Sequence, residues 1–317
     1  MVFSKLIGAV RGSARDGAGI CLGLYRVMLP LIVILKIMGE FDLIRYLALP
    51  LAPVMTLMGL PEDLGIAWAV SMAINLYSGL IVLASMIPSM DALSVAQTST
   101  FSLIVLYAHS LPVECRIAQQ CGLSLVFQLA FRVGAAILAG VALHLFFSRT
   151  GIFAEPALIL FPGDSAAPTL SQWAWSQVIN LVCIYCIITV LLLAQKAIDH
   201  YNIVRWLELP LLPLVKMVGV SRKAASTILV GMSMGLIYGS GLIIQAARDG
   251  RLSRRDIFGA ISLMGLAHAI IEDTFLLMVI GAHWTVVLAA RLVIATALTA
   301  AVMRVWLRSH PVAMDTQ

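Results

Sequence analysis

Long stretches of this chain are apolar and contain no Asp, Glu, Lys, Arg or His. Three of them, Leu64–Met90, Ala174–Gln195 and Ala224–Ala247, are 27, 22 and 24 residues long. A bilayer core about 30 Å thick needs about 20 apolar residues at the helical rise, so each stretch can cross a membrane as one helix. The pattern predicts an all-α, polytopic membrane protein.

The composition agrees with this pattern. The 317 residues are 61% apolar and 12% charged, whereas soluble domains carry about 25% charged residues. These values exclude a disordered chain, a secreted disulfide scaffold and a soluble cytosolic enzyme. The net charge of +5 does not indicate a nucleic-acid partner, because excess Lys and Arg in a membrane protein mostly mark cytoplasmic loops. The expected surroundings are the lipid bilayer of the cell's inner (plasma) membrane.

The second half of the chain repeats the first. The ten residues that begin at Ile44 (IRYLALPLAP) match the ten that begin at Val204 (VRWLELPLLP). Further matches follow at an offset of 160, which becomes 159 after one deletion. The matched pairs are Lys36/Lys196, Arg45/Arg205, Pro50/Pro210, Pro53/Pro213, Gly59/Gly219, Gly79/Gly239, His109/His268, Glu114/Asp273 and Arg132/Arg291. Nine pairs at two offsets are too many for chance, so they indicate a duplicated unit.

The duplication sets the expected organisation of the chain. Residues 1–18 alternate basic and apolar positions and predict an amphipathic segment on the cytoplasmic membrane face. A first repeat (19–148), a polar, proline-bearing linker (149–173), a second repeat (174–308) and a C-terminal tail (309–317) follow. We expect about 8–10 membrane segments, including short ones broken by proline.

Both repeats predict the same five elements. They are a long apolar helix (19–39 and 174–197), a Pro-x-x-Pro segment (44–59 and 203–218), a Gly/Ser-bearing span (64–88 and 224–247), a helix ending near a His–acid pair (94–115 and 255–275) and a helix with a central arginine (117–148 and 283–306). If the Pro-x-x-Pro segment crosses the bilayer, each repeat has an odd number of spans and the repeats are inverted. If it lies at the interface, they are parallel. Inversion leaves fewer basic residues outside, so the positive-inside rule favours it.

Arg132 and Arg291 lie in the middle of apolar helices. A charge at the bilayer centre costs at least about 2.5–3.5 kcal/mol on insertion scales, so it normally faces a partner or a water-filled cavity. One interpretation is structural: each arginine pairs with an acid, Glu114 or Asp273, within the fold. The other is functional: both arginines line a central cavity and contact an anionic or hydrogen-bonding solute.

A His–acid pair lies near the end of one helix in each repeat. His109 and Glu114 flank Pro112, which leaves one carbonyl without its helical donor and predicts a kink. His268 and Glu272 lie four residues apart on one helix face, with Asp273 beside them. Together, such groups can hold a divalent metal ion or relay a proton. The candidate metal ligands are His109, Glu114, His268 and Glu272. Buried histidines with satisfied hydrogen bonds and no function are the alternative.

Small and hydroxyl-bearing residues gather in the Gly/Ser-bearing span of each repeat. They include Asn75, Ser78, Tyr238 and Ser240. Close helix packing through small residues explains them in one interpretation. In the other, the glycines let the backbone open so that these side chains contact a solute.

The sequence L-P-L-x-P-x-x-x-x-x-G occurs at Leu49–Gly59 and again at Leu209–Gly219, each time followed by a Gly/Ser-bearing span. This pattern resembles the Gate domain, also called the nucleoside-recognition domain. The resemblance covers roughly residues 20–148 and 174–306, one unit per repeat. Such domains occur in bacterial spore-maturation membrane proteins, in the permease part of ferrous-iron transporters and in relatives of concentrative nucleoside transporters. The resemblance implies an inverted-repeat helical membrane protein that moves or senses a small solute.

These features predict a secondary transporter or permease, rather than an enzyme, for a small polar solute of anionic or nucleoside-like character. Inverted repeats with broken helices are common in such transporters, whose sites lie between the repeats at mid-membrane. The arginines would recognise charge, while the histidines and acids would couple protons or bind a cation. The alternatives are a divalent-metal permease that uses the His/carboxylate pairs, and a non-transporting membrane scaffold or sensor. The sequence is also compatible with a homo-oligomer.

Overall fold

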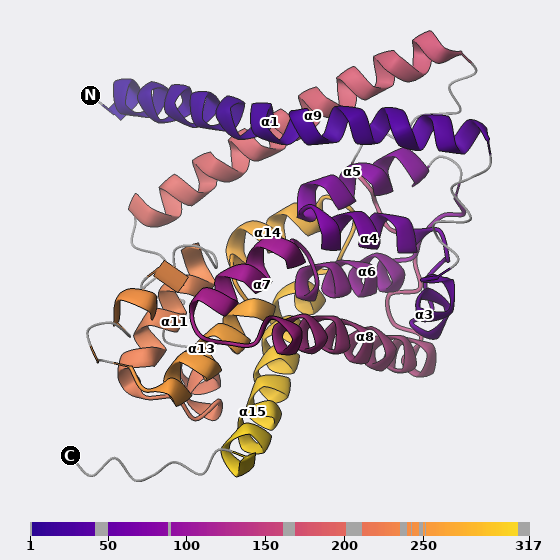
Figure 1. Ribbon diagram of the computed structural model, residues 1–317. Coiled ribbons are helices and arrows are strands. Elements are labelled where there is room, and N and C mark those ends of the chain that lie inside the picture. The colour runs from indigo at the N-terminus through magenta and orange to yellow at the C-terminus, as the bar shows by residue number, and fades with distance from the viewer. Residues whose placement is uncertain are drawn as a thin grey trace.

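Figure 1 shows a computed structural model of the chain, which describes residues 2–41, 50–87, 90–160, 169–200, 211–234, 240–241, 243–246, 250 and 252–309. Every named element in these ranges is a helix. The helices are α1 (Val2–Glu40), α3 (Ala52–Leu57), α4 (Leu64–Ala73), α5 (Leu76–Met86), α6 (Val95–Tyr107), α7 (Leu111–Gln120), α8 (Leu125–Thr150), α9 (Leu170–His200), α11 (Arg222–Met234), α13 (Arg254–Leu266), α14 (Ile270–Met278), the π-helical turn η2 (Thr285–Ala290) and α15 (Arg291–Ser309).

The fold is that of an all-α, polytopic membrane protein. Five helical segments of the described residues are long and apolar enough to cross a bilayer: Val95–Gln120, Leu125–Thr150, Leu170–Val190, Arg254–Met278 and Thr285–Arg308. The two segments that carry the predicted His–acid pairs are the most enclosed. In each of them 72% of an apolar 18-residue stretch is buried, against 33% of such a stretch in Leu125–Thr150. The helices that carry the pairs therefore form the centre of the bundle.

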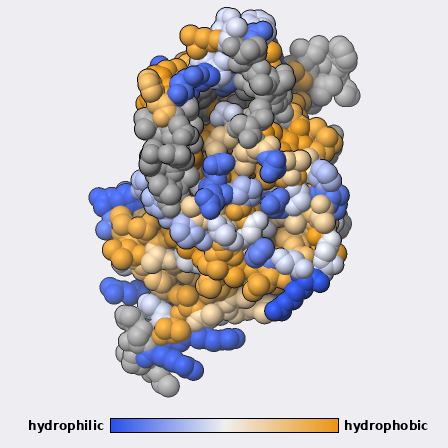
Figure 2. Space-filling view, turned by 90° about the vertical axis from the view of Figure 1, so that its right-hand side faces the viewer, coloured by the Kyte–Doolittle hydropathy of each residue, from blue (hydrophilic) through white to orange (hydrophobic). Residues whose placement is uncertain are grey.

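The outer face of the molecule is strongly apolar. On α8, Leu129, Leu138 and Leu145 are exposed large apolar side chains. Figure 2 shows broad apolar areas on one side of the molecule, interrupted by scattered polar residues. An outer face of this kind suits contact with lipid rather than with water.

Two long helices, α1 and α9, cross each other above the rest of the bundle (Figure 1). The hydroxyl of Tyr25 donates to the carbonyl of Leu181 at 2.5 Å, and that of Tyr185 donates to the carbonyl of Ala14 at 3.2 Å. With 39 residues, α1 is about 58 Å long at 1.5 Å per residue. The sequence predicts an amphipathic segment over 1–18 and a separate span over 19–39, but α1 runs through both without a break.

The backbone supports the duplication. The equivalent helices α6 and α13 both have 13 residues, and their bounds differ by the predicted offset of 159. Both begin with a capping box, at Ser94 and Ser253. Gly59 and Gly219 are also equivalent, and both have left-handed backbone, with φ of 68° and 83°.

The single span predicted over 64–88 is wrong. Two shorter helices, α4 and α5, fold back on each other there. Asn75 begins the second helix, because its side chain accepts a hydrogen bond from the backbone N–H of Ser78 at 2.9 Å. A Cβ on Gly79 would lie 2.5 Å from the Cβ of Ser71, so glycine allows the two helices to approach closely. The sequence predicts one helix here because the run is uncharged and long enough to span a bilayer, and the turn at Asn75 that divides it is short.

In the described part of the Pro-x-x-Pro segment of the first repeat, residues 50–59, the helix is too short to cross the bilayer. α3 has six residues, about 9 Å at the helical rise, with Pro53 in its first turn. In the second repeat residues 211–217 are helical, whereas 201–210 lie outside the described residues.

Inversion itself follows from contacts between the repeats. The backbone N–H of His283, which follows α14, donates to Ser99 Oγ near the start of α6 at 2.9 Å. Near the start of α13, Phe258 packs against Phe127 at the start of α8, with ring centroids 5.0 Å apart. The start of the path α6–α7 thus lies beside the end of the path α13–α14, and the start of α13–α14 lies beside the end of α6–α7. The continuous path α6–α7 therefore runs opposite to α13–α14, as in an inverted repeat.

The predicted linker is not helical over residues 151–160, where it contains a turn at residues 152–153. The carbonyl of Glu155 accepts a hydrogen bond from the N–H of Val95 at 2.9 Å, and the N–H of Leu160 donates to the carbonyl of Val279 at 2.9 Å. Because α8 ends at Thr150, the linker begins at residue 151. The linker joins the start of α6 to the end of α14 on one side of the bundle. Residues 161–168 and the tail from 310 lie outside the described residues.

Candidate functional site

The central helix path is interrupted at the same place in both repeats. One break lies between α6 and α7, and the other between α13 and α14. Ser110 (φ 49°) and Ala269 (φ 45°) precede the new helices with left-handed backbone, which is unfavourable for a residue with a Cβ. Pro112 predicts the first break, but Ile271 takes its place in the second. Unfavourable backbone repeated at equivalent points directs attention to these breaks as a functional site.

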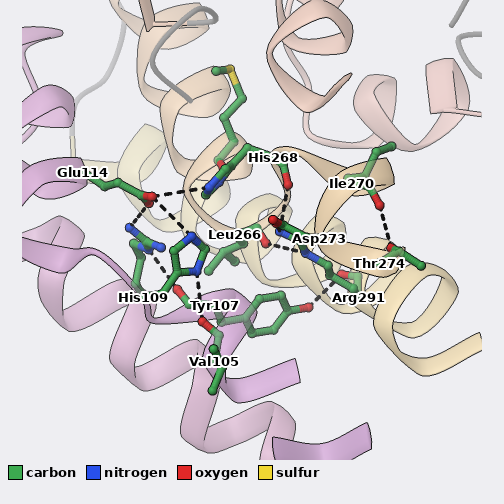
Figure 3. A network of polar contacts seen from close by, with 12 residues as sticks. Val105, Tyr107, His109, Glu114, Leu266, His268, Ile270, Asp273, Thr274 and Arg291 are labelled. Carbon is green, nitrogen blue, oxygen red and sulfur yellow. Dashed lines mark hydrogen bonds and ion pairs between the residues drawn. The ribbon is translucent and has the colours of Figure 1, made fainter. Parts of the chain in front are cut away.

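Each break carries one of the predicted histidines. Nδ1 of His109 lies 3.0 Å from the carbonyl oxygen of Val105, and Nδ1 of His268 lies 2.8 Å from that of Met264. A carbonyl oxygen only accepts hydrogen bonds, so Nδ1 carries a hydrogen in both rings. The two buried rings lie 5.2 Å apart between centroids. The repeats therefore meet at the two histidines (Figure 3).

Glu114, from α7, joins the histidines of both repeats. Its Oε1 lies 3.3 Å from Nε2 of His109 and 3.4 Å from Nε2 of His268. Figure 3 shows the carboxylate with contacts to both rings. The three donor atoms lie within 4.8 Å of one another, and all three residues are buried. Two imidazoles and a carboxylate in this arrangement can hold a divalent transition-metal ion or share a proton.

The two arginines are fully buried and paired within their own repeats. Nε of Arg132 donates to the carbonyl of Tyr107 at 2.8 Å, and its Nη1 donates to Oε2 of Glu114. Nε of Arg291 donates to the carbonyl of Leu266 at 3.1 Å, and its Nη2 lies 3.2 Å from Oδ2 of Asp273. These contacts match the interpretation in which each arginine pairs with an acid within the fold, because each guanidinium charge is neutralised by a carboxylate.

Each arginine nevertheless keeps one buried nitrogen without a hydrogen-bond partner among the described residues. These atoms are Nη2 of Arg132 and Nη1 of Arg291. A buried donor without a partner is costly unless water or a ligand satisfies it.

Glu272 does not join the cluster of the three other candidate metal ligands. Instead, its Oε1 accepts a hydrogen bond from the hydroxyl of Tyr77 in α5 at 2.6 Å, another polar contact between the repeats. The buried Tyr107 hydroxyl makes a further one, donating to the carbonyl of Arg291 at 2.7 Å. Sequence reasoning missed both tyrosines, because neither has a tyrosine at the equivalent position of the second repeat.

The other predicted site residues have different places. Asn75 caps α5, so its amide oxygen is occupied by backbone. Ser78 and Ser240 are buried, and Tyr238 lies outside the described residues. Within the part of the chain that the structure describes, neither Asn75 nor Ser78 forms a hydrogen bond with His109, Glu114 or His268.

A pocket of about 310 Å³ opens away from the cluster. Its lining includes Gly59, Ser94, Gln97, Thr100 and His144, from the first repeat. Neither arginine lines this pocket. The buried cluster and the pocket are therefore separate features.

Comparison with known proteins gives one informative relative. The chain is 26% identical over 305 residues to the "Uncharacterized membrane protein YvoD" of Bacillus subtilis (strain 168), and the match covers 92% of this chain and 93% of that protein. No family model and no solved structure matches the chain. The relative is named as a membrane protein, and the match extends over both repeats.

Proposed function

We propose that this protein is a secondary transporter or permease of the cell's inner membrane that moves a small cation through the interface between its repeats. The observation that carries this proposal is the buried cluster of His109, Glu114 and His268, to which both repeats contribute. Its histidines lie at breaks in antiparallel central helices. Transporters with inverted repeats place their substrate sites at such discontinuous helices near mid-membrane.

The geometry favours a cation over an anionic solute. An anion would need a free positive charge, but Arg132 and Arg291 are each engaged by an acid. The cluster itself offers a carboxylate oxygen and two imidazole nitrogens, which attract a proton or a metal ion. The alternative of a cation permease therefore has better support than recognition of an anionic or nucleoside-like solute by the arginines.

The resemblance to the Gate domain belongs to this proposal as well. Membrane proteins with that domain move or sense small solutes, and the antiparallel repeats described above are compatible with such a role. A transporter role also implies that the chain is not an enzyme.

Flux measurements on reconstituted protein test the proposed function. Liposomes that contain either a trapped metal indicator or a trapped pH indicator are given Zn²⁺, Co²⁺, Mn²⁺ or a pH gradient. We expect at least one of these cations to enter faster than into protein-free liposomes, and the flux to fall in His109→Gln and His268→Gln. His144→Gln is the matched control, because His144 lies in α8 and bonds Ser148 instead.

A scaffold or sensor gives a different result. Fluxes of all three metal ions and of protons would then equal those of protein-free liposomes, although the protein is folded and inserted. That outcome would contradict the proposed function.

A further inference from the structure

We infer that His109, Glu114 and His268 bind one divalent transition-metal ion through Nε2, Oε1 and Nε2. This inference deepens the proposed function, because it names the class of substrate at the same site. Binding of the metal and its transport are separate properties, however, and they can be measured separately.

The first argument is the direction of the lone pairs. Because both Nδ1 atoms face backbone carbonyls, at 3.0 and 2.8 Å, a neutral ring has its lone pair on Nε2. Both Nε2 atoms face Oε1 of Glu114, which is also an acceptor. Three acceptors directed at one another repel unless a positive species lies among them. The buried cluster is therefore built around a cation.

The second argument is the spacing, which separates a metal ion from a proton. A charge-assisted N–H···O hydrogen bond is about 2.7–2.9 Å long, shorter than the observed 3.3 and 3.4 Å from Nε2 to Oε1. Ligands that lie 2.0–2.1 Å from a tetrahedral ion are about 3.3–3.4 Å apart. These two nitrogen–oxygen distances match edges of such a tetrahedron better than they match two charge-assisted hydrogen bonds, and the two Nε2 atoms lie within 4.8 Å of each other.

The third argument is the support behind the ligands. Metal-binding histidines commonly donate their other ring N–H to a carbonyl, which fixes the orientation of the ring. Val105 and Met264 provide these carbonyls one helical turn before each histidine. Glu114 is held from behind by Arg132, whose Nε is in turn fixed by the carbonyl of Tyr107. All three ligands are thus oriented before a metal ion arrives.

The ligand set also indicates which metal ions fit. Imidazole nitrogen suits Zn²⁺, Fe²⁺, Co²⁺ and similar ions, whereas Mg²⁺ and Ca²⁺ prefer oxygen ligands. Two histidines and one carboxylate leave a fourth tetrahedral position for water or for a passing ligand. Arg132 pairs with the only carboxylate of the cluster, and its positive charge repels a metal ion bound by that carboxylate. The affinity is therefore limited, as release from a transport site requires.

Spectroscopic titration of the purified full chain in detergent tests this site directly. Co²⁺ is added, because a tetrahedral Co²⁺ site absorbs visible light much more strongly than hydrated Co²⁺. We expect saturable absorption at one Co²⁺ per chain, displaced by Zn²⁺ and unaffected by excess Mg²⁺. His109→Gln and His268→Gln should each weaken Co²⁺ binding more than about 100-fold, beyond the 10–100-fold typical of groups behind the ligands.

The controls keep the outcomes distinct. His144→Gln should bind Co²⁺ like the wild type, and thermal unfolding establishes that each variant is folded. Glu114→Gln serves as a third ligand variant if one histidine variant is unstable. Absence of saturable Co²⁺ absorption in the wild type, or wild-type binding in all three ligand variants, would overturn the inference. Proton flux without Co²⁺ binding would leave the proposed function intact, whereas Co²⁺ binding without any flux would overturn only that function.

Discussion

The two repeats share one backbone plan but use it differently at the centre. In both, an arginine donates through Nε to a carbonyl at the end of the central helix, at 2.8 Å in the first repeat and 3.1 Å in the second. In both, the same arginine pairs with an acid 18 residues before it. The acid is Glu114 in the first repeat and Asp273 in the second. Only Glu114 also contacts the histidine of the other repeat.

The difference is one methylene group. Asp273 has the length to pair with Arg291, so its contact is confined to its own repeat. Glu114 is longer, so one oxygen pairs with its arginine while the other lies between two histidines. Duplication thus supplied two equivalent ion pairs, and one of them became part of a shared site. The predictions below change this asymmetry in decreasing order of expected effect.

The largest effect is expected from removing either arginine. Arg132→Met and Arg291→Met each leave a buried acid without its partner, which destabilises a protein by about 3–5 kcal/mol. Zn²⁺ should raise the unfolding temperature of Arg132→Met more than that of Arg291→Met. The reason is that Arg132 shares Glu114 with the proposed ion and repels it, whereas Arg291 pairs with Asp273, which is not a ligand.

Thermal unfolding with and without Zn²⁺ measures this difference. The wild type provides the reference increment, because a ligand that binds only the folded state stabilises it by an amount that rises with the ratio of free ligand concentration to Kd, and is therefore larger for a tighter site. Equal increments in the two arginine variants would contradict the different roles assigned to the two ion pairs.

The next effect follows from exchanging the two acids. Glu114→Asp keeps an acid beside Arg132, as Asp273 does beside Arg291, but it shortens the side chain that reaches both histidines. Co²⁺ affinity should fall about 100-fold or more, a loss of about 2.8 kcal/mol. Adding Asp273→Glu should restore the affinity to within about tenfold, because the longer acid then lies in the second repeat.

Asp273→Glu alone is the matched control for this exchange. It keeps Glu114 in place and should retain Co²⁺ binding. If the double variant binds Co²⁺ no better than Glu114→Asp, the two repeats are not interchangeable at the site.

A smaller effect on stability is expected at the contact between Tyr77 and Glu272, which has no counterpart between the equivalent positions of the two repeats. Tyr77→Phe removes the hydrogen bond from its hydroxyl to Glu272. Hydrogen bonds to charged groups contribute about 1.5–3 kcal/mol, so the free energy of unfolding should decrease by about that amount. Co²⁺ affinity should stay near the wild-type value, because Glu272 is not a ligand.

Val113 occupies the position equivalent to Glu272 and is 56% exposed. Val113→Ala should therefore change stability by no more than about 0.5 kcal/mol, as is usual for surface substitutions. Denaturant unfolding of both variants tests the comparison. A loss of Co²⁺ binding in Tyr77→Phe would assign Glu272 to the metal site after all.

The smallest perturbation is expected from a pair of labelling positions. Gln119 and Met278 are exposed, equivalent residues at the ends of α7 and α14. With the five native cysteines replaced, a membrane-impermeant maleimide should label Gln119→Cys from the cytoplasmic side and Met278→Cys from the outside. Inverted and right-side-out vesicles distinguish the two sides. Labelling of both from the same side would contradict inverted repeats, while Co²⁺ binding should be unaffected in both variants.

Much of the fold and several site residues follow from the sequence, for one physical reason. Charged and polar residues in long apolar runs are costly in a bilayer, so they identify the buried centre. His109, Glu114, His268, Arg132 and Arg291 were all found in this way, and the offset of 159 related the two repeats.

Features that depend on tertiary contacts did not follow from the sequence. The uncharged run at 64–88 predicts one span, yet Asn75 and Gly79 turn it into two helices. The helix break at Ala269 could not be predicted in the same way, because no proline follows it in the sequence as Pro112 follows Ser110. Glu272 and Glu114 are equally plausible metal ligands in the sequence. Only the packing of the inverted repeats decides which of them faces both histidines.

Crystals grown with Co²⁺ and measured at its absorption edge provide the most direct test of the central claim. We predict one anomalous peak inside the bundle, about 2.0–2.2 Å from Nε2 of His109, Nε2 of His268 and Oε1 of Glu114. Anomalous density confined to surface residues, with the three side chains ordered and no peak among them, would contradict the claim that the repeats jointly form a metal site.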